Sequence, residues 1–284
     1  MTALAHHRRS LELFEEHLGP EDPMVARSLL NLGGALQEQG LLDEAHSTLL
    51  RALALSEKQG PSNIKVGVTQ INLGEVMLRL GRPSEAKLHF ERGIAITREV
   101  LGPDSAFLVI AEVGLGDVSH ALGDHDEALR HHVAAVALGE TILGPEHPEL
   151  IPALVGLGRS QRVLGSPAAE ATLRRALAIA DTLGSEAVSP VLLELGELLH
   201  ARGQAARAVP LLERALAVTP RAAGDTLDLG VRRLALAQAL WDARGDRRRA
   251  RMLAEQAREG LIAAGAPGRA AQAAATQWLA SRPQ

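Results

Sequence analysis

Eleven histidines are the most obvious candidates for metal chemistry in this chain. Two adjacent pairs, His6–His7 and His131–His132, occupy the same place in a repeated pattern. Neighbouring residues on an α-helix point about 100° apart, so one such pair cannot easily hold an ion from one side. We therefore interpret these histidines as solvent-exposed helix residues and predict no metal site. His147 stands in a link between helices, where a turn or capping role is expected.

Three further motifs have the outline of a ligand site but lack essential parts. Residues 124–127 (Asp-His-Asp-Glu) begin like a calcium loop, yet the later ligands and the central glycine are missing. Asp124 with Glu127 fits a helix capping box instead. Residues 114–116 and 156–158 lack the third glycine and the preceding strand of a dinucleotide site. With no phosphate loop or catalytic motif either, the sequence predicts a protein that is not an enzyme and needs no cofactor.

Arginines gather near the C-terminal end of the sequence. Residues 221–284 contain 11 arginines, no lysine and six acidic residues, although the whole chain has a net charge of −4. Such a concentration could contact phosphate groups or an acidic lipid surface. It has no interleaved aromatic residues, so we favour a solvated turn and keep contact with nucleic acid, membrane or an acidic partner as the alternative. The cluster consists of Arg244, Arg247, Arg248, Arg249 and Arg251.

The composition indicates which residue types form the core and in which cellular compartment the chain is expected. Hydrophobic residues make up 46% of the chain but aromatic residues only 2%, so the core must consist of leucine, alanine and valine. The absence of cysteine excludes disulfides and thiolate chemistry. No run of about 18 apolar residues could span a membrane, and the N-terminus has no apolar signal core. These features predict a soluble chain in the cytoplasm.

A Leu-Gly pair recurs along the chain inside helical patterns. The spacings are 41, 42, 42 and 38 residues, and a second glycine follows each pair seven residues later. A period near 42 in a helical sequence predicts a stack of helix pairs, in which each repeat needs only its neighbours. The inner glycines are Gly33, Gly74, Gly116, Gly158 and Gly196.

Residues 19–59 show how one repeat begins and ends its helices. The Gly-Pro pair at 19–20 stops the preceding helix, and Pro23 suits the first turn of the next. Gly40 ends that helix. Asp43 is a plausible N-cap of the second helix.

The inner glycine needs a structural reason, because glycine inside a helix costs about 1 kcal/mol relative to alanine. We predict that the missing side chain at Gly33 lets the second helix approach the backbone of the first. Alanines at the opposing positions, such as Ala45 and Ala52, agree with close helix packing.

The period divides the chain into six helix pairs with a partial repeat at each end. Residues 1–18 match the second helix of a repeat whose first helix is missing. They form either an N-terminal cap or the remainder of a longer protein, and we favour the second. Residues 266–284 are predicted to form a capping helix through Trp278 and Leu279. The repeats span residues 19–59, 60–101, 102–143, 144–183, 184–224 and 225–265.

These positions resemble the tetratricopeptide repeat (TPR). With Gly33 as position 8, leucine stands at position 7 and alanine at positions 20 and 27. The period and the link L-G-P-E-H-P at 143–148 resemble the repeats of kinesin light chain and the C-terminal TPR arrays of bacterial Ser/Thr kinases. The resemblance implies an all-α fold: a right-handed TPR superhelical solenoid of antiparallel helix pairs.

The TPR resemblance also implies that the first helix of each pair lines a concave groove. Asn31 and Asn72 share one register, and an asparagine can both donate to and accept from the backbone of an extended peptide. Gln37, Glu194 and Gln238 are expected on the same face. The groove is expected to be acidic in the third and fifth repeats and basic in the fourth, which favours a peptide over nucleic acid. The alternative is an unused, solvated face. The predicted peptide-binding residues are Arg27, Asn31, Asn72, Glu75, Arg79, Asp117, His120, Arg159, Arg162, Glu197, His200 and Trp241.

The sequence thus predicts a non-catalytic interaction module that binds a peptide or helix in its concave groove and is part of a bacterial signalling protein. The alternative is a peptide-sensing regulatory domain that switches an attached effector by compaction of the superhelix. No cofactor, metal or small-molecule substrate is expected. Nucleic acid and membrane partners are disfavoured, and the oligomeric state is left open.

Overall fold

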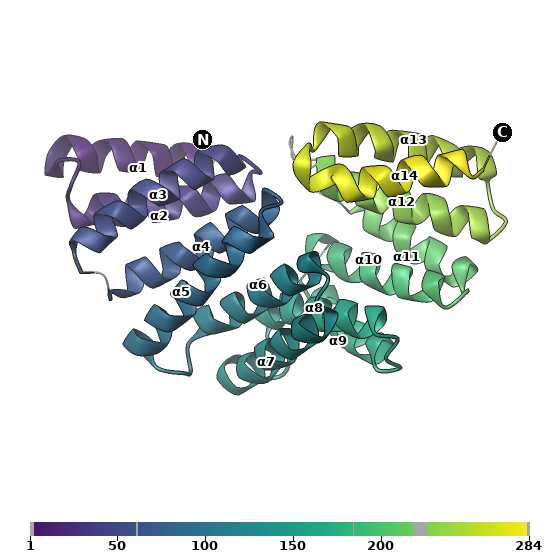
Figure 1. Cartoon of the computed structure of the whole chain (residues 1–284), viewed down its shortest axis with the longest axis horizontal. Coiled ribbons are helices and arrows are strands. Elements are labelled where there is room, and N and C mark those ends of the chain that lie inside the picture. The colour runs from purple at the N-terminus through teal and green to yellow at the C-terminus, as the bar shows by residue number, and fades with distance from the viewer. Residues whose placement is uncertain (1–2, 61, 184, 219–225, 283–284) are drawn as a thin grey trace. The chain divides into compact units, whose positions relative to one another are not determined.

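The computed structural model describes residues 3–60, 62–183, 185–218 and 226–282. These residues form 14 α-helices and two short 3₁₀ helices, and none of them lies in a strand (Figure 1). The all-α prediction is confirmed. The helices separate into two compact units, an N-terminal unit of residues 1–142 and a C-terminal unit of residues 143–284. None of the described helices is long and apolar enough to cross a bilayer.

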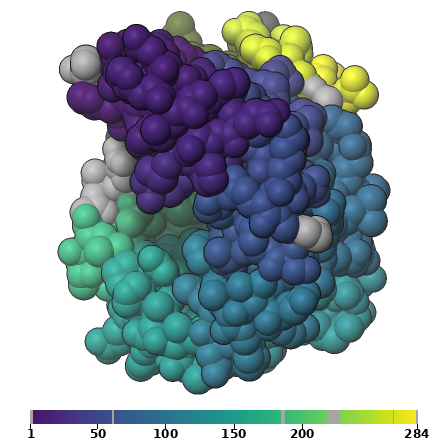
Figure 2. All heavy atoms as spheres, turned by 90° about the vertical axis from the view of Figure 1, so that its left-hand side faces the viewer, coloured from purple at the N-terminus to yellow at the C-terminus, as the bar shows by residue number. Residues whose placement is uncertain are grey.

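In the N-terminal unit, first helices and second helices alternate. The first helices pack on one another, α2 on α4 and α4 on α6, so they form a continuous inner layer. Helix α1 packs on α2, and the N-terminal residues of this unit are the purple spheres in Figure 2. The helices are α1 (Ala3–Leu18), α2 (Pro23–Glu38), α3 (Leu42–Lys58), α4 (Ile64–Arg79), α5 (Pro83–Leu101), α6 (Ala106–Leu122) and α7 (His125–Leu143).

The C-terminal unit repeats this arrangement. Its first helices also contact one another, α8 on α10, α10 on α12 and α12 on α14, and α8, α10 and α12 each pair with the helix that follows. The helices are η1 (Pro148–Leu150), α8 (Ile151–Val163), α9 (Ala169–Asp181), α10 (Ser185–Ala201), α11 (Ala205–Ala217), α12 (Thr226–Asp242), α13 (Arg247–Ala263), η2 (Ala266–Gly268) and α14 (Arg269–Ala280).

The predicted helix ends are partly confirmed. Pro23 begins α2, and the Asp22 carboxylate accepts a hydrogen bond from the amide of Met24 at 2.7 Å. Gly40 has φ 74°, a left-handed conformation that favours glycine. The N-cap prediction for Asp43 is wrong: α3 begins at Leu42, and Asp43 lies in its first turn. There its charge still interacts favourably with the positive end of the helix dipole.

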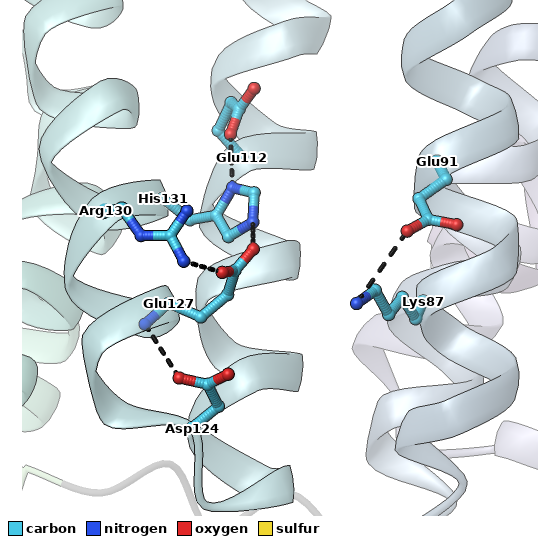
Figure 3. A network of polar contacts seen from close by, with 7 residues as sticks. All are labelled: Lys87, Glu91, Glu112, Asp124, Glu127, Arg130 and His131. Carbon is cyan, nitrogen blue, oxygen red and sulfur yellow. Dashed lines mark hydrogen bonds and ion pairs between the residues drawn. The ribbon is translucent and has the colours of Figure 1, made fainter.

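The capping box at the start of α7 is only half formed. The Asp124 Oδ1 atom accepts a hydrogen bond from the Glu127 amide at 3.0 Å. The Glu127 carboxylate does not return to the Asp124 amide, which donates to the Ser119 carbonyl instead. Glu127 contacts His131 and Arg130, as Figure 3 shows. His147 caps η1, as predicted, by accepting a hydrogen bond from the Glu149 amide.

The inner glycines mark close helix contacts, as predicted. A Cβ added to Gly33 would lie 2.5 Å from Cδ2 of Leu49, which is far inside normal contact distance. The residue over the glycine is therefore a large side chain of the second helix. Ala45 and Ala52 are fully buried on that helix and keep its backbone near the first. The equivalent glycines Gly74, Gly116, Gly158 and Gly196 meet Phe90, His132, Leu173 and Leu212.

The histidine pair of α7 is not solvent-exposed as predicted. His132 is completely buried because it takes the position over Gly116 that leucine or phenylalanine takes in the other repeats. His131 is partly buried and bonds to two carboxylates, Glu112 at 2.8 Å and Glu127 at 3.1 Å (Figure 3). The imidazole ring of His131 reaches Glu112 on the preceding helix, and the helical pattern alone did not show this.

Candidate functional site

The inner layer of the N-terminal unit carries a connected row of polar side chains. Gln37 of α2 donates from Nε2 to Oε2 of Glu75 on α4, at 2.7 Å. Arg79, one turn beyond Glu75, donates back to the main-chain oxygen of Gln37. These two contacts join α2 to α4 on the predicted groove face, so they fix the side chains that a ligand would meet.

Burial and neighbouring charges shift the pKa of Glu75 in this row. Burial raises the pKa of Glu75 above its ordinary value, and the Asp117 carboxylate of α6 adds to that rise. The hydrogen bond from Gln37 and the charge of Arg79 oppose it. Three successive first helices therefore contribute to one surface, on which two carboxylates stand beside a single arginine.

The predicted residues of α6 are held by the second helix of their own repeat. Oδ1 of Asp117 lies 3.4 Å from Nε2 of the buried His132. The ring of His120 lies 5.2 Å from the ring of His125 at the start of α7. The third repeat thus presents side chains that are already fixed by intramolecular contacts.

The two predicted asparagines differ from Gln37, Glu75 and Arg79 because their side chains make no such contacts. Asn31 is exposed on α2, beside the exposed Arg27, and Asn72 is half-buried on α4. Neither asparagine side chain pairs with another residue in the described part of the chain. Asn72, Glu75 and Arg79 are spaced i, i+3 and i+7, which places them on one face of α4. The two amides and Arg27 are therefore unpaired within the described residues, whereas Gln37, Glu75 and Arg79 bond to one another.

The C-terminal unit has an ion-pair network on its inner layer. Nε of Arg159 lies 2.8 Å from Glu194 Oε1, and Nη2 of Arg162 lies 3.0 Å from Glu194 Oε2. Arg162 also contacts Glu197 at 2.8 Å. Glu194 is only 8% exposed. The basic stretch predicted for the fourth repeat and the acidic stretch predicted for the fifth therefore neutralise each other between α8 and α10.

A small cavity adjoins this network. It has a volume of about 240 Å³ and is lined by Arg162, Glu197, His200 and Gln238, among others. Burial raises the pKa of Glu197, the Glu194 carboxylate adds to the rise, and Arg162 opposes it. Nε2 of His200 lies 2.8 Å from Asp242 of α12, a partner that the sequence analysis did not find.

Trp241 belongs to a different cluster from the other predicted residues. Its ring packs edge-on against Trp278 of α14, with the ring centres 5.6 Å apart. The guanidinium carbon of Arg247 lies 5.0 Å from the Trp241 ring centre. The end of α12 is thus tied to α13 and α14. In the described part of the chain, no group of three or more histidine, aspartate or glutamate side chains is arranged to hold a metal ion.

The fold and the inner layers define a class of protein: a helical repeat protein in which the stacked first helices of each unit present polar side chains. Residues 1–58, 30–99 and 107–182 match a sequence family described as tetratricopeptide repeat, and residues 191–226 match another family of that description. These matches cover well over half of the sequence. The chain belongs to the tetratricopeptide repeat family.

Solved structures agree with this assignment. BtubC from P. vanneervenii is 20% identical with a TM-score of 0.60, covering 77% of this chain and 91% of BtubC. A Podosopora anserina protein of kinesin light chain type, with nearly identical TPR-like repeats, is 26% identical with a TM-score of 0.51, covering 72% and 98%. A Rap protein complexed with competence and sporulation factor is 16% identical with a TM-score of 0.65, covering 95% and 80%. The predicted similarity to kinesin light chain repeats is confirmed.

No curated protein sequence gives a significant match. TPR proteins are in general non-catalytic modules for interaction with other proteins. The family and the fold support this general role in protein interaction for the chain.

Proposed function

We propose that this chain binds an extended peptide segment of a partner protein along the inner face of its first helices. The main support is the state of Asn31 and Asn72, whose amides are unpaired within the described residues and stand in one register. An amide that offers both a donor and an acceptor can pair with a peptide backbone regardless of its side chains. The bonded side chains of Gln37, Glu75 and Arg79 would then select among the side chains of the peptide.

The proposed setting is a bacterial signalling protein in the cytoplasm, with the chain acting as a non-catalytic module. This part of the proposal rests on the L-G-P-E-H-P link and the 42-residue period, which resemble arrays attached to Ser/Thr kinases. A second candidate is a peptide-sensing domain that switches an effector. The Rap protein of similar fold forms a complex with competence and sporulation factor. Compaction on ligand binding, measured by solution scattering, would distinguish this switch from a static module.

The test measures the affinity of two variants for peptides that the wild-type chain selects from a random twelve-residue library. Asn31→Ala/Asn72→Ala removes both amides, and each hydrogen bond lost should cost about 0.5–1.5 kcal/mol. We expect the dissociation constant, measured by fluorescence anisotropy, to rise about 5- to 150-fold. The control is Gln39→Ala, which removes an exposed amide just beyond α2.

Two results would count against the groove. Selected peptides that bind the double asparagine variant and the Gln39 variant equally well would show that binding occurs elsewhere. A library that yields no peptide for the wild-type chain would leave the inner face as a solvated surface. Circular dichroism of each variant should match the wild type, because all three positions are exposed or half-buried.

A further inference from the structure

Four arginines of the cluster expected to form a solvated turn also line an open cavity. The cavity lies at the turn between α12 and α13 and has a volume of about 1000 Å³. Four arginines line it, Arg247, Arg248, Arg249 and Arg251, all from the first turns of α13. This volume is of the size that binding clefts for small ligands and peptide side chains have in proteins.

The charges around this cavity do not cancel. Arg249 pairs with Glu213 of α11, and Nη2 of Arg251 lies 3.9 Å from Glu255. Asp246 also lines the cavity, but its carboxylate caps α13 by accepting from the Arg249 amide at 2.9 Å. Arg248 is exposed and has no hydrogen bond or ion pair with any described residue. Its guanidinium can therefore receive an anion without breaking an existing bond.

An apolar wall adjoins the charged side. Trp241 lines the cavity, and the Arg247 guanidinium over its ring and the Trp278 ring against its edge hold it in place. Arg282 packs over Trp278, with its guanidinium carbon 4.6 Å from the ring centre. Met252, one turn beyond Arg248, also lines the cavity and is 48% exposed. An exposed methionine beside a fixed tryptophan offers a contact for one apolar side chain.

We propose that this cavity is a second interaction site, outside the inner groove, for an acidic peptide segment that carries an apolar residue. A carboxylate of the peptide would pair with Arg248, since the planar guanidinium suits bidentate contact with a carboxylate. The apolar residue would pack on Met252 and Trp241. The site does not depend on the asparagine row of the N-terminal unit.

The shape of the site favours a peptide over nucleic acid or membrane. Binding of single-stranded nucleic acid requires exposed aromatic faces on which successive bases stack. The cavity is lined by one aromatic ring, and Arg247 and Trp278 already contact it. An anionic membrane surface attracts clusters of basic residues. The two acidic residues of the lining, Asp246 and Glu255, also disfavour a polyanion.

The test uses the whole chain and a labelled ten-residue peptide of nine glutamates with one central leucine. Anisotropy of the label measures affinity at about 0.1 M salt, where long-range attraction is screened. Emission of Trp241 and Trp278, the only two tryptophans of the chain, reports contact at the site. We expect binding with a change in tryptophan emission, and a loss of about tenfold or more in Arg248→Glu.

The matched control is Arg269→Glu, which makes the same charge change at an exposed position on α14. It should change the affinity by less than about twofold, and Asn31→Ala/Asn72→Ala should not change it. Arg248→Gln removes the charge without reversing it and should give an intermediate loss. This result would stand even if the peptides selected for the groove failed to bind there.

Three outcomes would overturn the proposal. The first is a wild-type chain that shows no binding or no change in tryptophan emission. The second is an equal loss in Arg248→Glu and Arg269→Glu, which would show a general charge effect. The third is tighter binding of a ten-residue thymidine oligonucleotide or of phosphatidylserine vesicles than of the peptide, which would assign the cluster to nucleic acid or membrane.

Discussion

Gly33 and Gly34 are neighbours in α2 but face different surroundings. A Cβ on Gly33 would lie 2.5 Å from Cδ2 of Leu49, whereas a Cβ on Gly34 would meet nothing within 4 Å. Gly33→Ala should therefore lower the free energy of unfolding by about 1–3 kcal/mol through overpacking. Gly34→Ala should be neutral or stabilising by up to about 1 kcal/mol, because alanine is the better helix former.

Urea denaturation of the two variants and the wild type measures this difference. Each substitution adds one methyl group to the same helix, so the comparison isolates the contact with Leu49. Equal stability changes in both variants would show that Leu49 moves aside without cost. The inner glycine would then have no packing role.

His131 has a pKa that is shifted by identified neighbours. Its hydrogen bond to Glu112 raises its pKa above the ordinary value near 6.5, and Glu127 adds to the rise against the effect of burial. At pH values below the pKa that His131 has in the unfolded chain, the protonated histidine therefore stabilises the fold. This contribution is lost as the pH rises through the folded-state pKa.

Glu112→Gln should lower the pKa of His131, as measured by NMR titration of the imidazole ring. The loss of stability relative to the wild type should be larger at about pH 5.5 than at about pH 9, because only the protonated ring needs the carboxylate. An unchanged pKa in the variant would mean that Glu127 alone sets it. An equal loss of stability at both pH values would contradict the linkage.

At the scale of elements, Glu194 holds α8 and α10 together. It pairs with Arg159 and Arg162 from the preceding repeat and is nearly buried. Glu194→Gln keeps the shape but leaves the two arginines without their main counter-charge. We expect the free energy of unfolding to fall by about 1–3 kcal/mol, less than for a fully buried pair because the arginines are partly exposed.

The control for this prediction is Glu259→Gln, an exposed glutamate of α13 in the same unit. Its effect in chemical denaturation should be within about 0.5 kcal/mol. A small effect of Glu194→Gln would mean that Glu197 replaces it as the partner of Arg162. Replacing both Arg159 and Arg162 by glutamate would place four carboxylates against one another. Such a variant would disturb the fold as well as any ligand binding.

At the scale of the whole molecule, the repeats build each unit from contacts between neighbouring helices. The core clusters contain leucine, alanine and valine with few aromatic residues, as the composition predicted. Phe90 is an exception: it is fully buried and covers both Gly74 and Gly114. A larger side chain at this position needs a second glycine in the next repeat. This explains why Gly114 stands where the first two repeats have asparagine.

The helix pairs, most of their ends and the register of the polar residues on each first helix could be predicted from the sequence alone. These follow from local rules: helical spacing of leucine, glycine at left-handed positions and proline in first turns. The row of Asn31, Asn72, Glu75 and Arg79 could be predicted because a fixed period carries one register from repeat to repeat. Its role as a binding site remains a prediction.

Which charged side chains pair with one another is visible only in the folded chain. Arg159 and Glu194 are 35 residues apart, His200 and Asp242 are 42 apart, and each pair joins two first helices. Periodicity places such residues on one face but does not give the rotamers and helix spacings that bring two of them within 3 Å. For the same reason, only the fold showed that Trp241 joins Trp278 and Arg247, and that the arginine cluster lines a cavity.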